Sequence, residues 1–455
     1  MRFGAFGDRR RRADVKTALK AERSRVLQSR VLMVSLVSFF AKLTDLSMFK
    51  TTRRSFSLAL LSLSTVGGYG SLHAQQAATA QAAGQLPPSQ VFWIGGYGPG
   101  IYASRLNADG SMVEPRLVAK QAKASFFAMH PTLDILYVVT ETAINDRERA
   151  ASLAAYQFDR AAYQAGDWSD AKALELKLVN VERVGGNGPC HVTVDSAGQF
   201  AVVSNYGSGS VCLFPIRPDG SLEPESSVVE HQGSGPNAAR QKGPHAHCAM
   251  VDPTNRWVLV ADLGLDQVLV YRLDGSSKKL VPGPSPFFKL AGGAGPRHLA
   301  FHPEGKLVYI INEMGMTLTS AAWDSETGTL TQIATVGSVP EETLQAGWST
   351  AEVLVHPSGR FVYGSNRGHN TIALFAISPK DGGAVRIENF STLGNTPRNF
   401  RIDPTGQFLL AENQDSNTVH SFAIDRGTGF LKATGHSISA EKPACIKFMT
   451  VRSAP

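Results

Sequence analysis

Cysteine is scarce in this chain, and long apolar runs near its N-terminus are missing. Only 4 of the 455 residues are cysteine. Cys190, Cys212, Cys248 and Cys445 show neither metal-binding spacing nor a convincing disulfide pair, so we expect four buried structural thiols. The apolar patch over residues 31–40 is too short to cross a bilayer. A disulfide-stapled scaffold, a cysteine metal centre and a membrane span at this patch are therefore not expected.

Charge is also low, at 18% of residues, although the formal net charge is +7. Much of the excess lies in the first 54 residues, including the run Arg9 to Arg12. A basic tail is not a basic face on a folded domain, so we expect no nucleic-acid partner. The 43 glycines and the 43% of hydrophobic residues instead fit a large, turn-rich all-β domain.

What the chain has in abundance is one repeated pattern, which begins near residue 125. A short apolar strand leads to Asp or His, then come a turn, a second apolar strand and a closing Asn or Asp; residues 190–205 and 297–312 are two clear copies. We call the residue before the turn the anchor. The anchors are His130, Asp195, Asp252, His302, His356 and Asp403. The residues ten positions later are Thr140, Asn205, Asp262, Asn312, Asn366 and Asn413. A register kept over six copies predicts a repeat architecture.

Each copy is expected to form one blade of a β-propeller. Its apolar runs are β-branched or aromatic and too short for helices, and two further runs after the Asn complete a four-stranded antiparallel meander. Residues 91–97 read as a second strand that lacks a first, and residues 443–448 as a first strand that lacks a second. The two ends should complete one more blade, which predicts an all-β, seven-bladed β-propeller closed by its N- and C-terminal strands.

The N-terminal region resembles a twin-arginine export signal. Met48 precedes the pair Arg53 and Arg54, an apolar run follows, and Leu-His-Ala stands before Gln75. Ser57 departs from the usual leucine. We therefore expect an untranslated or disordered extension over 1–47, a signal peptide over 48–74, a linker over 75–90 and the propeller over 91–455. The mature protein would be periplasmic or secreted, with the twin-arginine export machinery as a partner and no stable membrane insertion. The alternative is a cytoplasmic protein with an arginine-rich tail.

At two sets of equivalent positions, just before the anchors and just after the closing Asn, the copies carry differing polar residues instead of one repeated type. In antiparallel blades the residues four and five before each anchor and those eleven after it should lie at one face of the ring. We therefore predict one polar mouth of the central channel. Its members would include Arg297, Arg367, Arg398, Glu313, Glu352, His191, His245, His247 and His298.

Structural roles compete with this functional interpretation. The Asn and Asp row suits side chains that bind their own backbone after a strand, and the His and Asp anchors suit turn formation at the opposite face. Arg297 and Glu313 lie in one blade and are compatible with a purely structural salt bridge.

Several motifs in order resemble the lactonase family of seven-bladed propellers. They are residues 295–303 with Asn312-Glu313, residues 351–352 with 365–368, residues 396–398 with 412–414, and residues 243–247. The resemblance covers about residues 91 to 450. The bacterial 6-phosphogluconolactonase is the type member, and fungal muconate-lactonising cyclases share the fold.

The resemblance implies hydrolysis of a sugar lactone, either 6-phosphogluconolactone-like or another aldonolactone. Such a reaction needs a base, a donor for the oxyanion and contacts that hold the ring. The base would be Glu313 or a histidine, and Arg297 would contact the oxyanion or a carboxylate. We assign Arg297, Glu313, His298 and His247 to catalysis. Substrate binding is assigned to His191, His245, Glu352, Arg367, Arg398 and Gln414.

No cofactor is implied and no metal is required, because Glu313 and Glu352 among arginines make a poor cage for a hard cation. We expect a monomer whose small-molecule partner is the lactone. An exported member would open an unphosphorylated lactone, since 6-phosphogluconolactone is cytosolic. Two rivals remain: a lactonising cycloisomerase acting on a muconate-type dicarboxylate, and a non-catalytic periplasmic binding propeller. The second predicts aromatic platforms, and the mouth offers few beyond Phe126 and Tyr206.

Overall fold

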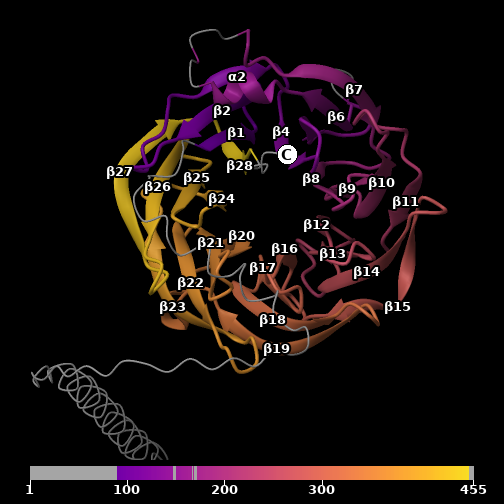
Figure 1. Ribbon diagram of the computed structural model, residues 1–455. Helices are drawn as coiled ribbons and strands as arrows, with labels where there is room; N and C mark the ends of the chain where they lie inside the picture. Colours follow the sequence, from indigo (N-terminus) through magenta and orange to yellow (C-terminus); the bar gives the residue numbers. More distant parts are fainter. Residues whose placement is uncertain (1–89, 147–149, 166–167, 169–171, 450–455) are drawn as a thin grey trace, which may run out of the picture. The chain divides into compact units, whose positions relative to one another are not determined.

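The computed structural model describes residues 90–146, 150–165, 168 and 172–449. These residues form seven four-stranded antiparallel sheets that follow one another around a common centre (Figure 1). Each sheet is a meander in which the first strand lies innermost and the fourth lies at the outer edge (Figure 1). The prediction of a seven-bladed β-propeller is confirmed.

The first four blades contain one of the two described helices. The first blade is β28 (Pro443–Phe448), β1 (Gln90–Gly96), β2 (Ile101–Leu106) and β3 (Arg116–Ala119). The second is β4 (Ala124–Met129), β5 (Ile135–Thr140), β6 (Ser152–Gln157) and β7 (Lys177–Arg183), with the short helix α2 (Arg160–Gln164) between its last two strands. The third is β8 (Pro189–Val194), β9 (Phe200–Asn205), β10 (Ser210–Pro215) and β11 (Ser227–Glu230). The fourth is β12 (Ala246–Val251), β13 (Trp257–Asp262), β14 (Gln267–Asp274) and β15 (Lys279–Lys289).

The remaining three blades repeat the same order. The fifth is β16 (Pro296–Phe301), β17 (Leu307–Asn312), β18 (Thr317–Asp324) and β19 (Thr329–Gly337), followed by the 3-10 helix η1 (Glu341–Thr343). The sixth is β20 (Ser349–Val355), β21 (Phe361–Arg367), β22 (Thr371–Ile377) and β23 (Ala384–Ser391). The seventh is β24 (Pro397–Ile402), β25 (Phe408–Asn413), β26 (Thr418–Ile424) and β27 (Leu431–Ser439).

The ring is closed by the two ends of the propeller. Strand β28 supplies the innermost strand of the first blade and pairs antiparallel with β1, with Trp93 opposite Lys447 and Ile94 opposite Ile446. This pairing covers the inner edge of the sheet that the N-terminal strands begin, so that edge is not left open. The predicted shared blade is confirmed.

The anchors form the turns that the sequence predicted. The Asp195 carboxylate accepts hydrogen bonds from the amides of Gln199 and Phe200, both at 2.6 Å. The His302 ring Nε2 lies 2.9 Å from the carbonyl of Gly359, which belongs to the turn of the next blade. A histidine anchor thus joins neighbouring blades as well as shaping its own turn.

The closing Asn row also has structural partners. Asn205 Nδ2 donates to Ser210 Oγ at 3.0 Å, and Asn312 Nδ2 donates to Thr317 Oγ1 at 2.9 Å. Both bonds connect the end of the second strand to the start of the third. These two residues therefore have a structural role, but they bind hydroxyl side chains of the next strand and not their own backbone as predicted.

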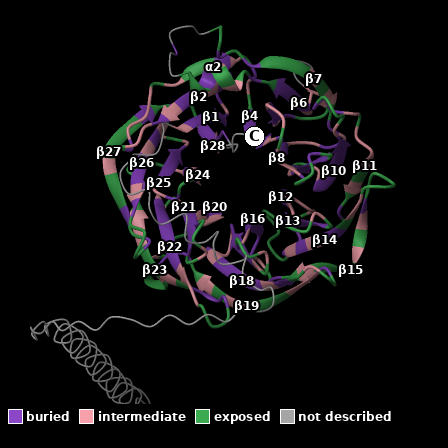
Figure 2. Cartoon of the chain, viewed as in Figure 1, coloured by how far each residue is buried: buried purple, intermediate pink, exposed green. Residues whose placement is uncertain are grey.

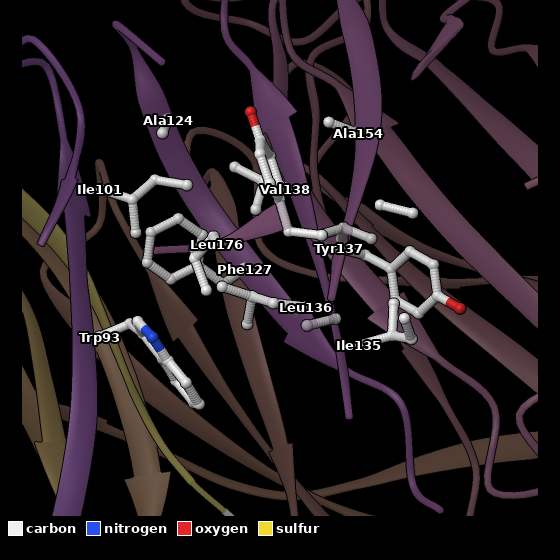
Figure 3. Close-up of a cluster of buried hydrophobic side chains, with 14 of the residues drawn as sticks. Trp93, Ile101, Ala124, Phe127, Ile135, Leu136, Tyr137, Val138, Ala154 and Leu176 are labelled. Atoms are coloured by element: carbon white, nitrogen blue, oxygen red, sulfur yellow. The ribbon is translucent and has the colours of Figure 1, made fainter. Parts of the chain in front are cut away.

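The apolar core lies between blades. Burial is concentrated on the inner strands, whereas the outer strands carry exposed residues (Figure 2). Between the first two blades, Trp93, Ile101, Phe127, Leu136 and Leu176 gather into one cluster (Figure 3). Full burial of side chains of this size stabilises the fold by about 1.5–3 kcal/mol each. The four cysteines are free and buried, as predicted.

Two sequence predictions concern the N-terminal segments. The extension, the twin-arginine segment and nearly all of the linker (1–47, 48–74 and 75–89) lie outside the described residues. Among the residues that are described, no helix is both long enough and apolar enough to cross a membrane.

Candidate functional site

The innermost strands carry the candidate site, and an irregularity at their starts determines how its side chains are arranged. In β16, Pro296 pairs with Asn312 and His298 with Ile311, so Arg297 has no partner of its own on β17. The same shift occurs in β12 and β24, around His247 and Arg398. A bulge of this kind brings two consecutive side chains to one side of the sheet instead of opposite sides. Arg297 and His298 can therefore both face the channel, one at its mouth and one beneath.

Glu313, just after β17, is the centre of an ion-pair cluster at the mouth. Its Oε1 lies 2.7 Å from Arg240 Nη2, and its Oε2 lies 2.9 Å from Arg367 Nη2 and 3.2 Å from Arg297 Nε. Arg297 and Arg367 are fixed further by backbone carbonyls. Arg297 Nη1 donates to Ala351 at 2.7 Å. One carboxylate thus orients three guanidinium groups.

A second polar group lies on the same side of the channel. The guanidinium carbon of Arg398 lies 5.1 Å from the centre of the Tyr97 ring, a cation–π geometry. The Tyr97 hydroxyl donates to Glu141 Oε2 at 2.9 Å. Tyr97 and Arg398 line one small cavity together with Arg297, His247 and His298, which we call the mouth cavity.

The electrostatics of Glu313 make it a poor candidate for the general base. Burial by itself would raise the pKa of this carboxyl, but Arg367, Arg297 and Arg240 outweigh burial and lower it from 4.5 to about 2. A carboxylate that binds protons so weakly is a poor general base at neutral pH. Four arginines lie near three carboxylates of the described residues, Glu313, Glu141 and the deeper Glu352, so cations outnumber carboxylates at the mouth.

Beneath the mouth, a layer of side chains that we call the plug divides the channel. His298 lies between the rings of His191 and His247, with ring centres 5.4 Å and 5.2 Å away, and Phe126 lies 5.8 Å away. The Glu352 carboxylate accepts from His298 Nδ1 at 2.8 Å and from Asn399 Nδ2 at 2.5 Å. Glu352 thereby fixes the orientation of the His298 ring.

His298 is the best-placed proton acceptor. Burial lowers its pKa, and although Glu352 opposes this effect, the net direction is downward, which favours the neutral ring. Because Glu352 accepts the Nδ1 proton, Nε2 carries the lone pair. Among the described residues, this buried Nε2 has no hydrogen-bond partner. The ring also lines the mouth cavity beside Arg297 and Arg398.

The predicted residues separate into distinct positions. The mouth cavity holds Arg297, His298, His247 and Arg398 and has a volume of about 10 Å³, which is space for one water. Glu313 and Arg367 lie behind Arg297 in the ion-pair cluster. A sugar ring bound here would have to lie at the open rim, with only a small group reaching inward.

Besides Glu313 and Arg367, four further predicted residues do not line the mouth cavity. His191 and Glu352 line a second cavity on the other side of the plug, which we call the lower cavity. The ring of His245 stacks on Tyr206 with centres 4.5 Å apart, and the Gln414 amide donates to Asp415 at 3.1 Å. His191 and Glu352 therefore lie deeper than one common mouth predicts, because the bulge places consecutive residues at different depths along the channel.

Three residues of the mouth were not assigned from the sequence. Arg240 lies between β11 and β12, outside the repeated strands, so comparing the copies gave no signal for it. Glu141 occupies the row that also contains Glu313, and Tyr97 occupies the equivalent position of the shared blade. A comparison that included the shared blade would have found Tyr97, whereas Glu141 already stood in the compared row.

These observations define a class: a seven-bladed propeller with an arginine-rich polar site at one end of its channel. A family model described as "Lactonase, 7-bladed beta-propeller" matches residues 91–448. The chain belongs to this lactonase family, which confirms the family that its motifs resemble.

Individual relatives support the assignment. The chain is 35% identical to a 6-phosphogluconolactonase of Bacillus subtilis over 351 residues, which cover 77% of this chain and 94% of that protein. It is 30% identical to a 6-phosphogluconolactonase of Formosa agariphila over 283 residues, 62% of this chain and 75% of that protein. The structure of a periplasmic gluconolactonase of Pseudomonas aeruginosa is similar with a TM-score of 0.73 and 28% identity, covering 80% of this chain and 100% of that one.

Proposed function

We propose that this protein hydrolyses a sugar lactone at the mouth of its channel, with His298 as the general base. The observation that carries the proposal is the unpartnered, buried Nε2 of His298, a residue that lines a water-sized cavity together with Arg297 and Arg398. Relatives named 6-phosphogluconolactonase and gluconolactonase support the substrate class.

The reaction follows from these positions. Nε2 of His298 takes a proton from a water whose oxygen attacks the lactone carbonyl, and the guanidinium groups of Arg297 and Arg398 stabilise the oxyanion that forms. The ring C–O bond then breaks, and the proton returns from His298 to the departing ring oxygen. The products are a hydroxyl and a carboxylic acid on one open chain, and the acid releases its remaining proton to solvent to become the carboxylate. Glu352 holds the base in position.

The decisive experiment replaces the base. The chain from Gln75 is assayed for hydrolysis of 6-phosphoglucono-δ-lactone and glucono-δ-lactone, with spontaneous hydrolysis subtracted. His298→Asn should lower kcat about 10²- to 10⁴-fold with a smaller change in KM, because a positioned base contributes about that much. His302→Asn is the matched control, since this histidine lies on the turn after the same strand. A full rate in His298→Asn would exclude His298 as the base.

The arginines have a separate test. Arg297→Ala should lower kcat more than it changes KM, since the oxyanion exists only after attack. Arg297→Lys keeps the charge but loses the fork that also reaches the carbonyl of Ala351, so it should restore only part of the rate. If Arg297→Ala changed KM alone, Arg297 would bind the substrate without stabilising the oxyanion.

The substrate depends on where the protein works. We propose export through the twin-arginine route and, with it, preference for an unphosphorylated aldonolactone; the periplasmic gluconolactonase of P. aeruginosa is consistent with this. A fusion starting at Met48 should reach the periplasm, and replacing Arg53 and Arg54 with lysine should prevent this. Retention of the unaltered fusion in the cytoplasm would contradict export. Faster turnover of the phosphorylated lactone would contradict the preference for an unphosphorylated one.

A further inference from the structure

The lower cavity lies on the other side of the plug from the proposed reaction and has a volume of about 280 Å³. It is lined by residues of the innermost strands that lie one to four positions before the anchors, and by Lys447 of β28. Thr193, Met250, Leu354, Arg401 and Lys447 are each partly exposed, so the cavity is open to solvent. It is much larger than the mouth cavity, and the mechanism above does not use it.

Two cations from neighbouring blades share this cavity. Arg401 extends from β24 and Lys447 from β28. Arg401 Nε donates to the carbonyl of Ile446 at 3.1 Å, and no other hydrogen bond of its side chain occurs among the described residues. Lys447 has neither a hydrogen bond nor an ion pair within the described part of the chain. Partly buried ammonium groups are costly without an anion.

The nearby carboxyl groups do not neutralise these cations. Glu352 is already bound to His298 Nδ1, Asn399 Nδ2 and the amide of Val353. Burial raises the pKa of Glu412 well above its usual range, although Arg401 opposes this, so its neutral form is favoured. Burial and Arg401 lower the pKa of Lys447 to about 8, which is what two cations without a full counter-charge produce.

One side of the wall is apolar. Leu299, Phe301, Val353 and Leu354 contribute to it from β16 and β20, and Met250 from β12. An inorganic anion would neutralise the cations but would leave the apolar surface in contact with water. A ligand with one negatively charged end and a compact apolar body would pair with the cations and also cover the apolar wall.

We propose that the lower cavity is a second binding site, which takes a small organic carboxylate with an apolar body. Its carboxylate would bind Lys447 and the free guanidinium nitrogens of Arg401, and its body would contact the side chains of β16 and β20. Because His298 and Phe126 line both cavities, only the plug separates this ligand from the proposed reaction.

The test uses the full chain and benzoate as the probe, with binding measured by calorimetry. Lys447→Met keeps the apolar stem and removes the charge, so it should weaken benzoate binding about tenfold or more, because charge-assisted hydrogen bonds are strong. Lys447→Arg should restore the affinity. Lys432→Met, an exposed lysine on β27, is the matched control and should change nothing.

Further variants locate the site and protect the test against misfolding. Met250→Phe fills the cavity without changing charge and should also weaken benzoate binding, whereas Arg398→Ala at the mouth should not. Benzamide, which lacks the charge, should bind at least tenfold more weakly. Equal affinity for benzoate in folded Lys447→Met, or loss of binding in Arg398→Ala, would overturn the proposal. Tighter binding of inorganic phosphate that depends on Lys447 would refute the carboxylate class.

Discussion

The ion-pair cluster around Glu313 makes a prediction about stability that is independent of activity. Glu313→Gln keeps the shape of the side chain but leaves Arg297, Arg367 and Arg240 without their shared anion. The side chains of Glu313, Arg297 and Arg367 are 6%, 4% and 15% exposed, so solvent cannot replace the lost charge. Arg240 is 44% exposed and contributes little.

The expected loss of unfolding free energy in Glu313→Gln follows from the pKa of Glu313. The difference between 4.5 and about 2 corresponds to about 3 kcal/mol of unfolding free energy, at about 1.4 kcal/mol for each pH unit. Removal of one partner from a buried ion pair costs a similar amount, about 3–5 kcal/mol. At neutral pH, Glu313→Gln should therefore lower the unfolding free energy by about 3 kcal/mol. For a propeller of this size that is about 4 °C in melting temperature.

The sign of the pH dependence provides a second check. The folded-state pKa is lowered, so the stabilisation is fully present above pH 4.5 and is lost as pH falls from 4.5 through about 2. Urea unfolding of both proteins between pH 7 and pH 2.5 should show the difference shrinking on acidification. Glu326→Gln is the control, because Glu326 pairs with Arg256 on the surface, at 80% exposure, and should cost under about 1 kcal/mol. A loss below about 1 kcal/mol in Glu313→Gln, or a loss independent of pH, would refute the reasoning.

Three further predictions concern packing, the anchors and the orientation of the base. Phe127→Ala, at a fully buried position, should lower the unfolding free energy by about 3–5 kcal/mol, measured in urea, and a change below about 1 kcal/mol would contradict the packing between blades. His302→Ala removes the contact with the Gly359 carbonyl and should cost about 1–3 kcal/mol with kcat unchanged; a fall in kcat without unfolding would contradict its purely structural role. Glu352→Gln should lower kcat about tenfold or more and shift the pH–rate profile, because the His298 Nδ1 proton loses its charged acceptor, and an unaltered profile would argue against His298 as the base.

The fold was predictable because each blade repeats the same local signals. An anchor such as Asp195 and a closing residue such as Asn205 make hydrogen bonds within a few residues of themselves, so their spacing in the chain reveals their role. The closing blade was also predictable, because residues 91–97 and 443–448 are each an incomplete copy of the pattern. Both predictions could be made without knowing which blades contact each other.

The site was predictable only in part. Its strongest members, Arg297 and Glu313, differ from the equivalent residues in most other copies, and this difference is visible in the sequence. Arg240 belongs to a connection between blades, where no copy provides a comparison. Gln414 follows the same row as Glu313, yet its amide binds Asp415 next to it in the chain.

The sequence by itself determined the number of blades, their strands, the closure of the ring and the polar character of the innermost rows, because all of these depend on short-range periodicity. Only the tertiary structure decided the depth of each side chain. One extra residue at the start of an inner strand brings Arg297 and His298 to the same side of the sheet, at two levels of the channel. That arrangement separates the mouth cavity from the lower cavity, and it depends on how the blades meet rather than on the order of residues within any one of them.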